Sequence, residues 1–432
     1  MICKDSLAAA PCIIPNALIR QNNGKANHLL LATAHSSIHV ADIKITPTTK
    51  PTRTVSRFVA RYQRLKMREP ETFSLSDFNA RYGRASFSRL TDLDTLRPAD
   101  RDAAHAALRA VVGRTPIDAV VPIGGGTTAA RLFRIDAGGH QYLLRLEGTV
   151  SPLERLGFEP LESPLRNPHQ YVSLRIAAEV GIAPRLHYVD ETSRVAVTDF
   201  IFRQPLSTYP GGPPRLAKAV GELLARLQAT PTFPHFVLYP DIVGRLWAHV
   251  CRTGLFAPDV LDRCNEHLER IRAAYVWDHD RSVSSHNDSV PSNILFDGSR
   301  LWMVDWESAY RTDPLVDIAI VGDHLARTPE LEDILLRAWL GRTPDDALRV
   351  RLGFVRALTR LYYAGVLLSA SATAPRAASD TSITAPTLAD MQHAFSVGRL
   401  RVGTLAASHV LEKMFLASFL TEIATPGFDI TI

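Results

Sequence analysis

One short segment, residues 285–307, constrains the fold and chemistry of this chain more than any other. Within it, His286, Asp288 and Asn293 form the pattern His-x-Asp-x-x-x-x-Asn, and Asp305 follows after an apolar run. Phosphoryl transfer asks a protein mainly to position an acceptor hydroxyl and to neutralise charge on phosphate oxygens with divalent metal. The spacing of these polar residues therefore predicts a phosphoryl-transfer site.

Each of these four side chains suits one part of that chemistry. Asp288 would accept the proton of the acceptor hydroxyl, and His286 would brace the loop that carries it. Asn293 would turn its carbonyl oxygen toward Mg²⁺, and Asp305 would bind metal that bridges the β- and γ-phosphates. Asp288 and His286 are therefore the predicted catalytic residues, and Asn293 and Asp305 are the predicted metal ligands.

Apolar residues on both sides of a polar turn predict how Asp305 is presented. Residues 294–296 and 301–304 are apolar, and Asp297-Gly298-Ser299 separates them. Apolar runs bounded by turn residues are typical of a β-hairpin. Asp305 would then stand just past the end of a strand.

His286-Asn287-Asp288, Asn293 and Asp305-Trp306-Glu307 resemble the catalytic and metal-binding motifs of the aminoglycoside phosphotransferase and choline kinase superfamily. Residues 313–319 resemble the segment that follows the metal aspartate there, in which Asp317 would support the loop. The resemblance implies a small-molecule kinase that uses ATP and Mg²⁺. It also implies an α+β, bilobal, protein-kinase-like fold with a small, mainly antiparallel β N-lobe and a larger, mostly helical C-lobe.

On this basis the chain divides into three parts. Residues 1–75 form a basic N-terminal extension, residues 76–202 the nucleotide-binding N-lobe, and residues 203–432 the C-lobe with the catalytic loop, metal site and acceptor-binding helices. The N-lobe pattern is strand, glycine loop, strand, turn, strand over residues 122–146. Glycines suit a loop over triphosphate because the backbone comes close to the ligand without a Cβ in the way.

Arg145 is the predicted phosphate clamp, because it occupies the place of the third-strand lysine of protein kinases. Choline and ethanolamine kinases resemble this chain in placing arginine there, and a guanidinium binds phosphate oxygens through a planar fork. An acidic residue on the following helix would normally hold it. Gln170 stands near that position, and Glu159 or Glu162 are the alternatives.

A buried strand over residues 194–201 resembles the hinge between the lobes, with backbone groups of Asp199 to Ile201 facing the adenine edge. Beyond it, apolar residues from Leu216 to Leu227 mark one face of a helix. The predicted nucleotide-binding residues are Gly124, Gly125, Gly126, Thr127, Arg145, Gln170, Asp199, Phe200 and Ile201.

The C-terminal half is predicted to be mostly helical. Thr328-Pro329 and Thr343-Pro344 are typical helix starts. A separate short helix is expected from Pro98 to Val112, ending at Gly113. Apolar periodicity predicts a long helix over residues 348–362 and a second over residues 388–419. The stretch between them, residues 369–386, is expected to be a flexible loop.

Composition agrees with a globular enzyme: the chain has 432 residues, of which 46% are hydrophobic and 22% charged. Its four cysteines form no Cys-x-x-Cys pair, which favours a reducing, cytoplasmic location without structural disulfides. No apolar run is long enough to cross a bilayer, so we expect no membrane partner. The list of cysteines is Cys3, Cys12, Cys251 and Cys264.

The net charge of +5 is unevenly distributed, and this argues against a nucleic-acid partner. Residues 1–66 carry ten Lys or Arg and two Asp, which leaves 39 basic and 42 acidic residues in the remainder. Three interpretations of the basic segment stay open. It is a poorly ordered tail, an organellar presequence, or sequence upstream of a true start at Met67.

Family resemblance favours a small alcohol acceptor with a cationic nitrogen, such as choline, ethanolamine, thiamine or an aminoglycoside. Carboxylates and aromatic faces hold such cations, although core packing is the alternative role for each aromatic residue. The candidates are Glu307, Tyr310, Trp339, Tyr362 and Tyr363.

Two other functions remain open at the level of sequence. A protein serine/threonine kinase is disfavoured because Trp306-Glu307 follows Asp305 where a protein kinase has Phe-Gly. A catalytically weak nucleotide-binding regulator is suggested by Gln170 and the irregular glycine loop, and intact Asp288, Asn293 and Asp305 count against it. Oligomeric state and the choice between ATP and GTP are not encoded in any motif.

Overall fold

The computed structural model describes Leu93 and residues 95–123, 130–147, 169–372, 378–401, 404–425 and 428. The N-terminal extension, the predicted glycine loop with Gly124, Gly125, Gly126 and Thr127, and both Glu159 and Glu162 lie outside the described residues. Among the described helices, none combines the length and apolar character that crossing a membrane requires.

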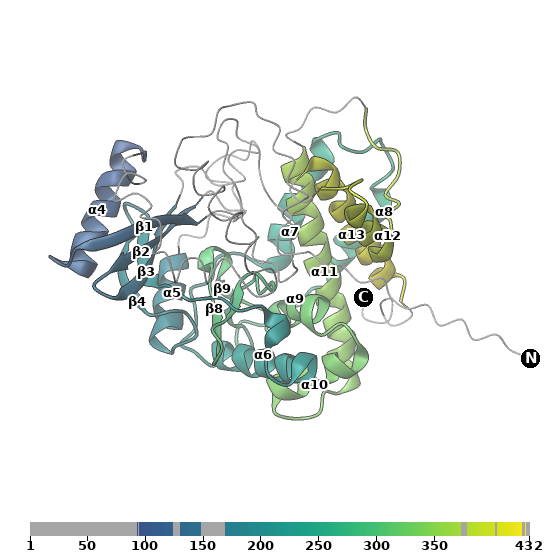
Figure 1. Cartoon of the computed structure of the whole chain (residues 1–432). Helices are drawn as coiled ribbons and strands as arrows, with labels where there is room; N and C mark the ends of the chain where they lie inside the picture. Colours follow the sequence, from purple (N-terminus) through teal and green to yellow (C-terminus); the bar gives the residue numbers. More distant parts are fainter. Residues whose placement is uncertain are drawn as a thin grey trace, which may run out of the picture. The chain divides into compact units, whose positions relative to one another are not determined.

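The N-lobe is built on one five-stranded sheet with the order β1-β2-β3-β5-β4, in which every neighbouring pair is antiparallel (Figure 1). This confirms the predicted β architecture of the lobe. A separate hydrophobic core, made from the sheet and one covering helix, stabilises it. The strands are β1 Ile117–Ile123, β2 Arg131–Ala137, β3 His140–Leu146, β4 Leu186–Asp190 and β5 Val195–Asp199.

The covering helix, α4 (Pro98–Val112), has the bounds that the sequence predicted. Proline at its first position needs no hydrogen-bond partner for its missing N–H, and Gly113 ends it with a φ of 61°. Ala104, Ala107 and Leu108 are buried at helical spacing, so this face packs on the sheet.

A two-residue turn between β2 and β3 fixes the register of the strand that carries Arg145. Gly138 and Gly139 have φ of 56° and 78°, and Ala137 pairs with His140 across the turn. Tight hairpin turns of this kind require positive φ at both central positions. A Cβ on Gly138 would also lie 2.7 Å from the Thr115 side chain, so glycine is required there.

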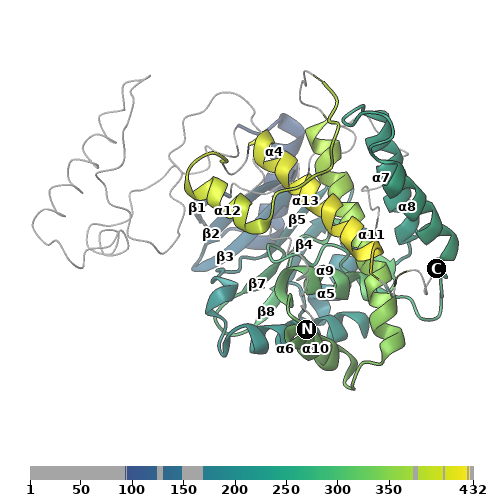
Figure 2. The ribbon, with the colours of Figure 1, turned by 90° about the vertical axis from the view of Figure 1, so that its right-hand side faces the viewer.

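The C-lobe is mostly helical, as predicted, and the long helix α11 lies at its centre, packed against α7, α9 and α13 (Figures 1 and 2). Short strand pairs, β6 with β9 and β7 with β8, carry the catalytic segment. The helices are α5 Gln170–Glu179, α6 Gly212–Gln228, α7 Tyr239–Arg252, α8 Asp262–Ala274, α9 Leu315–Leu325, α10 Pro329–Leu340, α11 Asp346–Ser371, α12 Leu388–Ser396 and α13 Leu405–Ile423. The short strands are β6 Val283–Ser285, β7 Ile294–Phe296, β8 Leu301–Met303 and β9 Tyr310–Thr312, and the 3₁₀ turns are η3 Leu206–Thr208 and η4 Trp306–Ser308.

Two of the predicted helix starts have different outcomes. The prediction for α10 is confirmed, since the Thr328 hydroxyl accepts the Leu331 N–H. The prediction of a start at Thr343 is wrong by two residues. Asp345 caps α11 by accepting the Leu348 N–H at 2.8 Å, while the Thr343 hydroxyl accepts a hydrogen bond from Arg337.

The single helix expected over residues 388–419 is wrong, because the chain forms α12 and α13 there. Gly398 has a φ of 72°, which no continuing right-handed helix allows. A new helix starts after Thr404, whose hydroxyl accepts the Ala407 N–H. The apolar periodicity continues across the break because both helices bury one face in the same core.

The connection between α11 and α12 is less free than the sequence suggested. Helix α11 continues to Ser371, and the described residues 378–386 are anchored around Asp380. The Asp380 carboxylate accepts hydrogen bonds from Lys413 at 2.5 Å and from His409 at 2.9 Å, and its backbone pairs with the segment after α7. The prediction of a flexible loop does not hold for this part.

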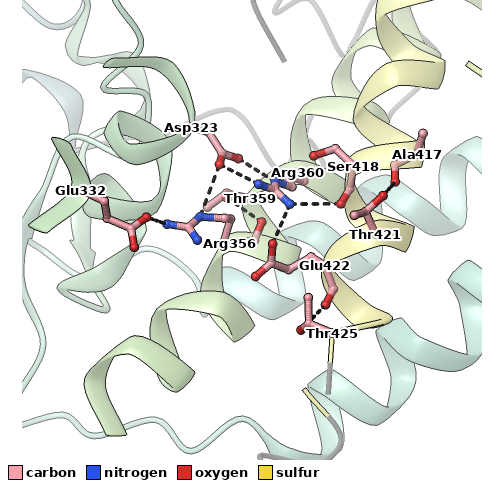
Figure 3. A network of polar contacts seen from close by, with 10 residues as sticks. All are labelled: Asp323, Glu332, Arg356, Thr359, Arg360, Ala417, Ser418, Thr421, Glu422 and Thr425. Carbon is pink, nitrogen blue, oxygen red and sulfur yellow. Dashed lines mark hydrogen bonds and ion pairs between the residues drawn. The ribbon is translucent and has the colours of Figure 1, made fainter. Parts of the chain in front are cut away.

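A network of ion pairs ties four C-lobe helices together (Figure 3). Arg360 on α11 makes a bidentate pair with Asp323 of α9, at 2.7 and 2.8 Å, and contacts Glu422 of α13 at 2.7 Å. Arg356, one turn earlier on α11, contacts both Asp323 and Glu332 of α10. These side chains are largely buried, so the network fixes how α11 sits against α9, α10 and α13.

Candidate active site

The loop that follows β6 carries Asp288, and the buried carboxylate of Asp317 organises it from the first turn of α9. The backbone N–H groups of His286 and Asn287 donate to Asp317 at 2.8 and 2.9 Å. The hydroxyls of Ser285 and Ser289 donate to it at 2.7 and 2.9 Å. A buried carboxylate with four donors is fully satisfied, and it holds the loop in one shape. Asp317 thus has the supporting contacts that the family resemblance implied.

Asn287 shapes the same loop from the other side. Its backbone has a φ of 60°, a left-handed conformation that asparagine tolerates better than most residues. Its side-chain amide donates to the carbonyls of Ser308 and Tyr310, at 3.0 and 3.2 Å. The catalytic loop is therefore joined to the segment that follows Asp305.

His286 lies where a bracing role requires it. Its Nε2 is 2.9 Å from the carbonyl oxygen of Val304, so Nε2 must carry the proton and donate it. The imidazole packs on the indole of Trp306, with ring centroids 4.8 Å apart. Burial lowers the pKa of His286 below its ordinary value. A neutral imidazole therefore links the catalytic loop to the residue preceding Asp305.

Asp288 is held through both of its carboxylate oxygens. The side-chain amide of Asn293 donates to Asp288 Oδ2 at 2.8 Å and to the Asp288 carbonyl at 2.9 Å. The hydroxyl of Tyr363, from α11, donates to Oδ1 at 2.8 Å. Because the side-chain nitrogen of Asn293 faces Asp288, the side-chain oxygen Oδ1 of Asn293 is the atom that remains for a cation.

Burial raises the pKa of Asp288 to about 7. The hydrogen bond from Tyr363 opposes this rise, the neighbouring negative charge of Asp305 adds to it, and the hydrogen bond from Asn293 opposes it again. A carboxylate with a raised pKa is a stronger base than an exposed one. Asp288 is therefore suited to receive a proton.

Asp305 stands directly after the β7–β8 hairpin, and the pairing of Ile294 with Met303 confirms that hairpin. It has a left-handed backbone, with φ 70° and ψ 66°, and directly precedes the turn η4 without a side-chain cap hydrogen bond. The backbone N–H of Val304 donates to the backbone carbonyl of Asn293 at 3.0 Å. The hairpin thus brings both predicted metal ligands to the same end of the two strands.

Arg145 reaches this site from the N-lobe sheet. Its guanidinium lies 2.8 Å from Asp305, 3.1 Å from Glu307 and 3.4 Å from Glu147. Burial acts to lower the pKa of Arg145, but the three carboxylates outweigh it and hold the pKa above its ordinary value. The predicted clamp and the predicted metal ligand are therefore direct neighbours.

In its own lobe Arg145 contacts Glu147, which directly follows β3, whereas the sequence pointed to the following helix; the alternatives Glu159 and Glu162 lie outside the described residues. Glu147 follows Arg145 at the two-residue spacing that puts strand side chains on one face. Gln170 contacts Glu147 and donates to it at 2.5 Å. The two-residue spacing from Arg145 to Glu147 is the sequence signal that indicates this pair.

The donors around Asp305 fit Mg²⁺ bound together with a nucleotide. Among the described residues, no group of three or more His, Cys, Asp or Glu side chains forms a complete metal cage. Magnesium is commonly held by one or two protein oxygens, with substrate phosphates and water supplying the rest. The carboxylate of Asp305 and the amide oxygen of Asn293 are that kind of incomplete donor set.

Backbone groups of the predicted hinge are partly engaged by the protein itself. The N–H of Asp199 donates to the Arg185 carbonyl at 2.9 Å, and that of Phe200 donates to the Gln141 carbonyl at 3.0 Å. Within the described part of the chain, the Ile201 N–H has no such partner. Of the three predicted residues, Ile201 is thus the one whose N–H is left for a nucleotide.

The residues proposed to bind the acceptor molecule divide into two groups, those near Asp288 and Trp339. Tyr362 lies within electrostatic range of Asp288, Tyr310 and Glu307, and Tyr363 contacts Asp288 directly. Burial, reinforced by Asp305, raises the pKa of Glu307 to about 8. Trp339 instead packs between α10 and α6, where its indole N–H donates to Gln228 at 2.9 Å. The contacts of Trp339 are those of a core residue.

Comparison with solved structures shows the fold. A choline/ethanolamine kinase family protein from Mesorhizobium loti superposes with a TM-score of 0.52 at 21% identity, over 77% of this chain and 97% of its own. A choline kinase from Cryptosporidium parvum Iowa II superposes with a TM-score of 0.50 at 11% identity, over 74% of this chain and 95% of its own. Both confirm the predicted kinase-like α+β fold.

Sequence comparison gives short curated matches and a longer family match. Protein LicA of Haemophilus influenzae is 40% identical over 58 residues, so the match spans 22% of that relative and 13% of this chain. The model of the phosphotransferase enzyme family matches residues 119–352, which is more than half of the chain and contains Arg145, the loop with Asp288 and Asn293, and Asp305. This protein therefore belongs to the phosphotransferase enzyme family.

Proposed function

We propose that this protein is a small-molecule kinase that transfers the γ-phosphate of ATP to an alcohol hydroxyl. The observation that carries the proposal is that three chemical parts share one site. Asn293 contacts Asp288, and the β7–β8 hairpin joins Asn293 to the segment of Asp305. Arg145 then contacts Asp305 from the other lobe. A base, two metal donors and a phosphate clamp are the parts that phosphoryl transfer uses.

In this proposal each side chain has one task. Asp288 takes the proton of the acceptor hydroxyl as the oxygen attacks the γ-phosphorus, the bond from that phosphorus to the β-phosphate oxygen breaks, and ADP leaves. Arg145 binds phosphate oxygens through its planar fork. Asn293 and Asp305 would hold Mg²⁺, which when bound would neutralise charge on the phosphate oxygens. His286 and Asp317 keep the loop in shape through the contacts described above.

The nucleotide would enter between β3 and the hinge. The N–H of Ile201, which has no backbone partner among the described residues, and the guanidinium of Arg145 would contact opposite ends of ATP, and the glycines at 124–126 would close over the phosphates. Gln170 would act indirectly, since it holds Glu147, which in turn contacts Arg145.

The acceptor we propose is a cationic amino alcohol such as choline, ethanolamine, thiamine or an aminoglycoside. The similar proteins include a choline/ethanolamine kinase family protein and a choline kinase, which supports this class. The surroundings of Asp288 also support it, because the rings of Tyr310 and Tyr362 lie nearby, together with the side chain of Glu307.

A screen for ADP release tests both parts of the proposal. Purified protein, Mg²⁺ and ATP are incubated with a panel of alcohol metabolites, and Asp288→Asn is the blank. We expect ADP release that depends on at least one cationic amino alcohol and is lost in the blank. Release that is equal in wild type and Asp288→Asn would show that Asp288 is not the base. A protein substrate phosphorylated in place of any metabolite would overturn the small-molecule acceptor.

A further inference from the structure

The second oxygen of Asp288 has a partner that no sequence pattern connects to it. Tyr363 lies 75 residues further along the chain, on α11, and its hydroxyl donates to Asp288 Oδ1 at 2.8 Å. Asn293 donates to Oδ2. The carboxylate is thus held on both sides, by the catalytic loop on one and by a C-lobe helix on the other.

Three aromatic neighbours fix the ring of Tyr363. It stacks on Phe415 with centroids 5.6 Å apart and an interplanar angle of 29°. His324 and Tyr362 meet it nearly at right angles, at 6.2 and 5.5 Å. Burial, reinforced by the nearby Asp288, raises the pKa of Tyr363 above its ordinary value, so the phenol stays protonated. The hydroxyl oxygen is thereby held beside Asp288 Oδ1.

The helix that carries Tyr363 is itself fixed. Arg360, one turn before Tyr363, makes the bidentate pair with Asp323 (Figure 3). Asp323 directly precedes His324 in the last turn of α9. The same α9 carries Asp317 in its first turn, and Asp317 shapes the catalytic loop. Both supports of the loop therefore come from helices that the ion-pair network joins rigidly.

We propose that Tyr363 is a positioning residue that sets the orientation of the Asp288 carboxylate toward the acceptor hydroxyl. This inference rests on the proposed kinase function. An ionised carboxylate has about four acceptor positions, and the donors from Asn293 and Tyr363 each take one on a different oxygen. The carboxylate then has a single rotation about its Cβ–Cγ bond, and a free position on Oδ1 or Oδ2 is aimed at the substrate.

Removal of the hydroxyl should therefore slow the chemical step and leave binding intact. In Tyr363→Phe only Asn293 still holds the carboxylate, so the productive orientation is less populated. We expect kcat to fall by about 10- to 100-fold, because small misplacements of a catalytic group have effects of that order. The KM values for nucleotide and acceptor should stay within about twofold of wild type.

Tyr275→Phe is the matched control, since it removes the same kind of hydrogen bond elsewhere in the C-lobe. The Tyr275 hydroxyl donates to Asp313 at 3.1 Å, and its ring stacks on Phe354. Both variants should lose similar thermal stability, and only Tyr363→Phe should lose kcat. An equal loss of kcat in both variants, or a raised acceptor KM with normal kcat in Tyr363→Phe, would overturn the positioning role.

A crystal structure of Tyr363→Phe tests the inference separately from the proposed function, because it needs no substrate. The inference predicts that the Asp288 carboxylate rotates or occupies two orientations. A single, unchanged orientation would contradict the positioning role, whether or not any acceptor is turned over. Absence of turnover by wild-type protein with every acceptor would count against the kinase function alone.

Discussion

At the scale of single residues, the catalytic loop depends on one buried carboxylate. Asp317 accepts four hydrogen bonds from the loop, and these are the contacts that give Asp288 a defined place. A buried acceptor of this kind contributes little net stability while it is paired, but its replacement is costly because the donors lose their partner. Asp317 should therefore matter for stability and for activity together.

Asp317→Asn tests this. The new NH₂ group faces hydrogen-bond donors, so we expect a loss of about 2–4 kcal/mol in the free energy of unfolding. The activity should fall with it. Asp190→Asn is the control, since Asp190 accepts hydrogen bonds from Thr192 and Ser193 in an exposed turn. Denaturant titration gives the free energy of unfolding of both variants. An equal loss in Asp317→Asn and Asp190→Asn would show that Asp317 does not organise the loop.

The residue contacts that the sequence did not predict are those between distant segments. The pattern over residues 286–305 identified which side chains gather at the site, because their spacing is local and hairpin-borne. The partnership of Tyr363 with Asp288 depends on how α11 packs, and no local spacing encodes that. Sequence reasoning proposed Tyr363 only as a possible cage residue.

At the scale of elements, helix ends were predicted well where one cap dominates. Pro98 and Gly113 define α4, and Thr328 caps α10, as the sequence indicated. The start of α11 was misplaced because Thr343 and Asp345 are both suitable N-cap residues, and the Asp345 carboxylate is the one that accepts the helix N–H. The break after α12 was missed because a periodic apolar pattern outweighed the glycine at 398.

The shifted pKa of His324, on helix α9, predicts how the stability of the protein depends on pH. Burial lowers the pKa of His324 to about 4 from an ordinary value of 6.5. The unfolded chain therefore binds a proton between these values that the folded protein does not, so stability is complete above pH 6.5 and is lost as the pH falls toward 4. The loss is at most about 1.4 kcal/mol per pH unit.

Thermal unfolding between pH 7 and pH 5 measures this effect. His324→Gln, which has no titrating ring, should flatten the part of the curve that His324 contributes. A variant with the same pH dependence as wild type would show that His324 does not stay neutral in the folded protein.

At the scale of the whole molecule, the Figure 3 network joins the helices that support the site. Arg360 pairs with Asp323 and Glu422, and all three side chains are 13–15% exposed. Removing one member of a buried pair leaves charge without compensation. The rotation of α11, and with it the place of Tyr363, therefore depends on this network.

Arg360→Met should lower the free energy of unfolding by about 3–5 kcal/mol, the usual cost of breaking a buried ion pair. Arg175→Met is the matched surface change. It breaks a pair with Glu191 in which both side chains are more than 40% exposed, and we expect a loss of no more than about 1 kcal/mol. Similar losses in the two variants would contradict a structural role for the network.

We propose Asp288 as the base of an ATP-dependent transfer to a small alcohol, and this role can be measured. The most direct measurement is mass spectrometry of the phosphorylated acceptor formed by wild type and Asp288→Asn, combined with calorimetric titration of Mg²⁺-ATP into both. We predict product from wild type only, with nucleotide binding within a few fold in the two proteins. Phosphorylated acceptor from Asp288→Asn at the wild-type rate would contradict the account.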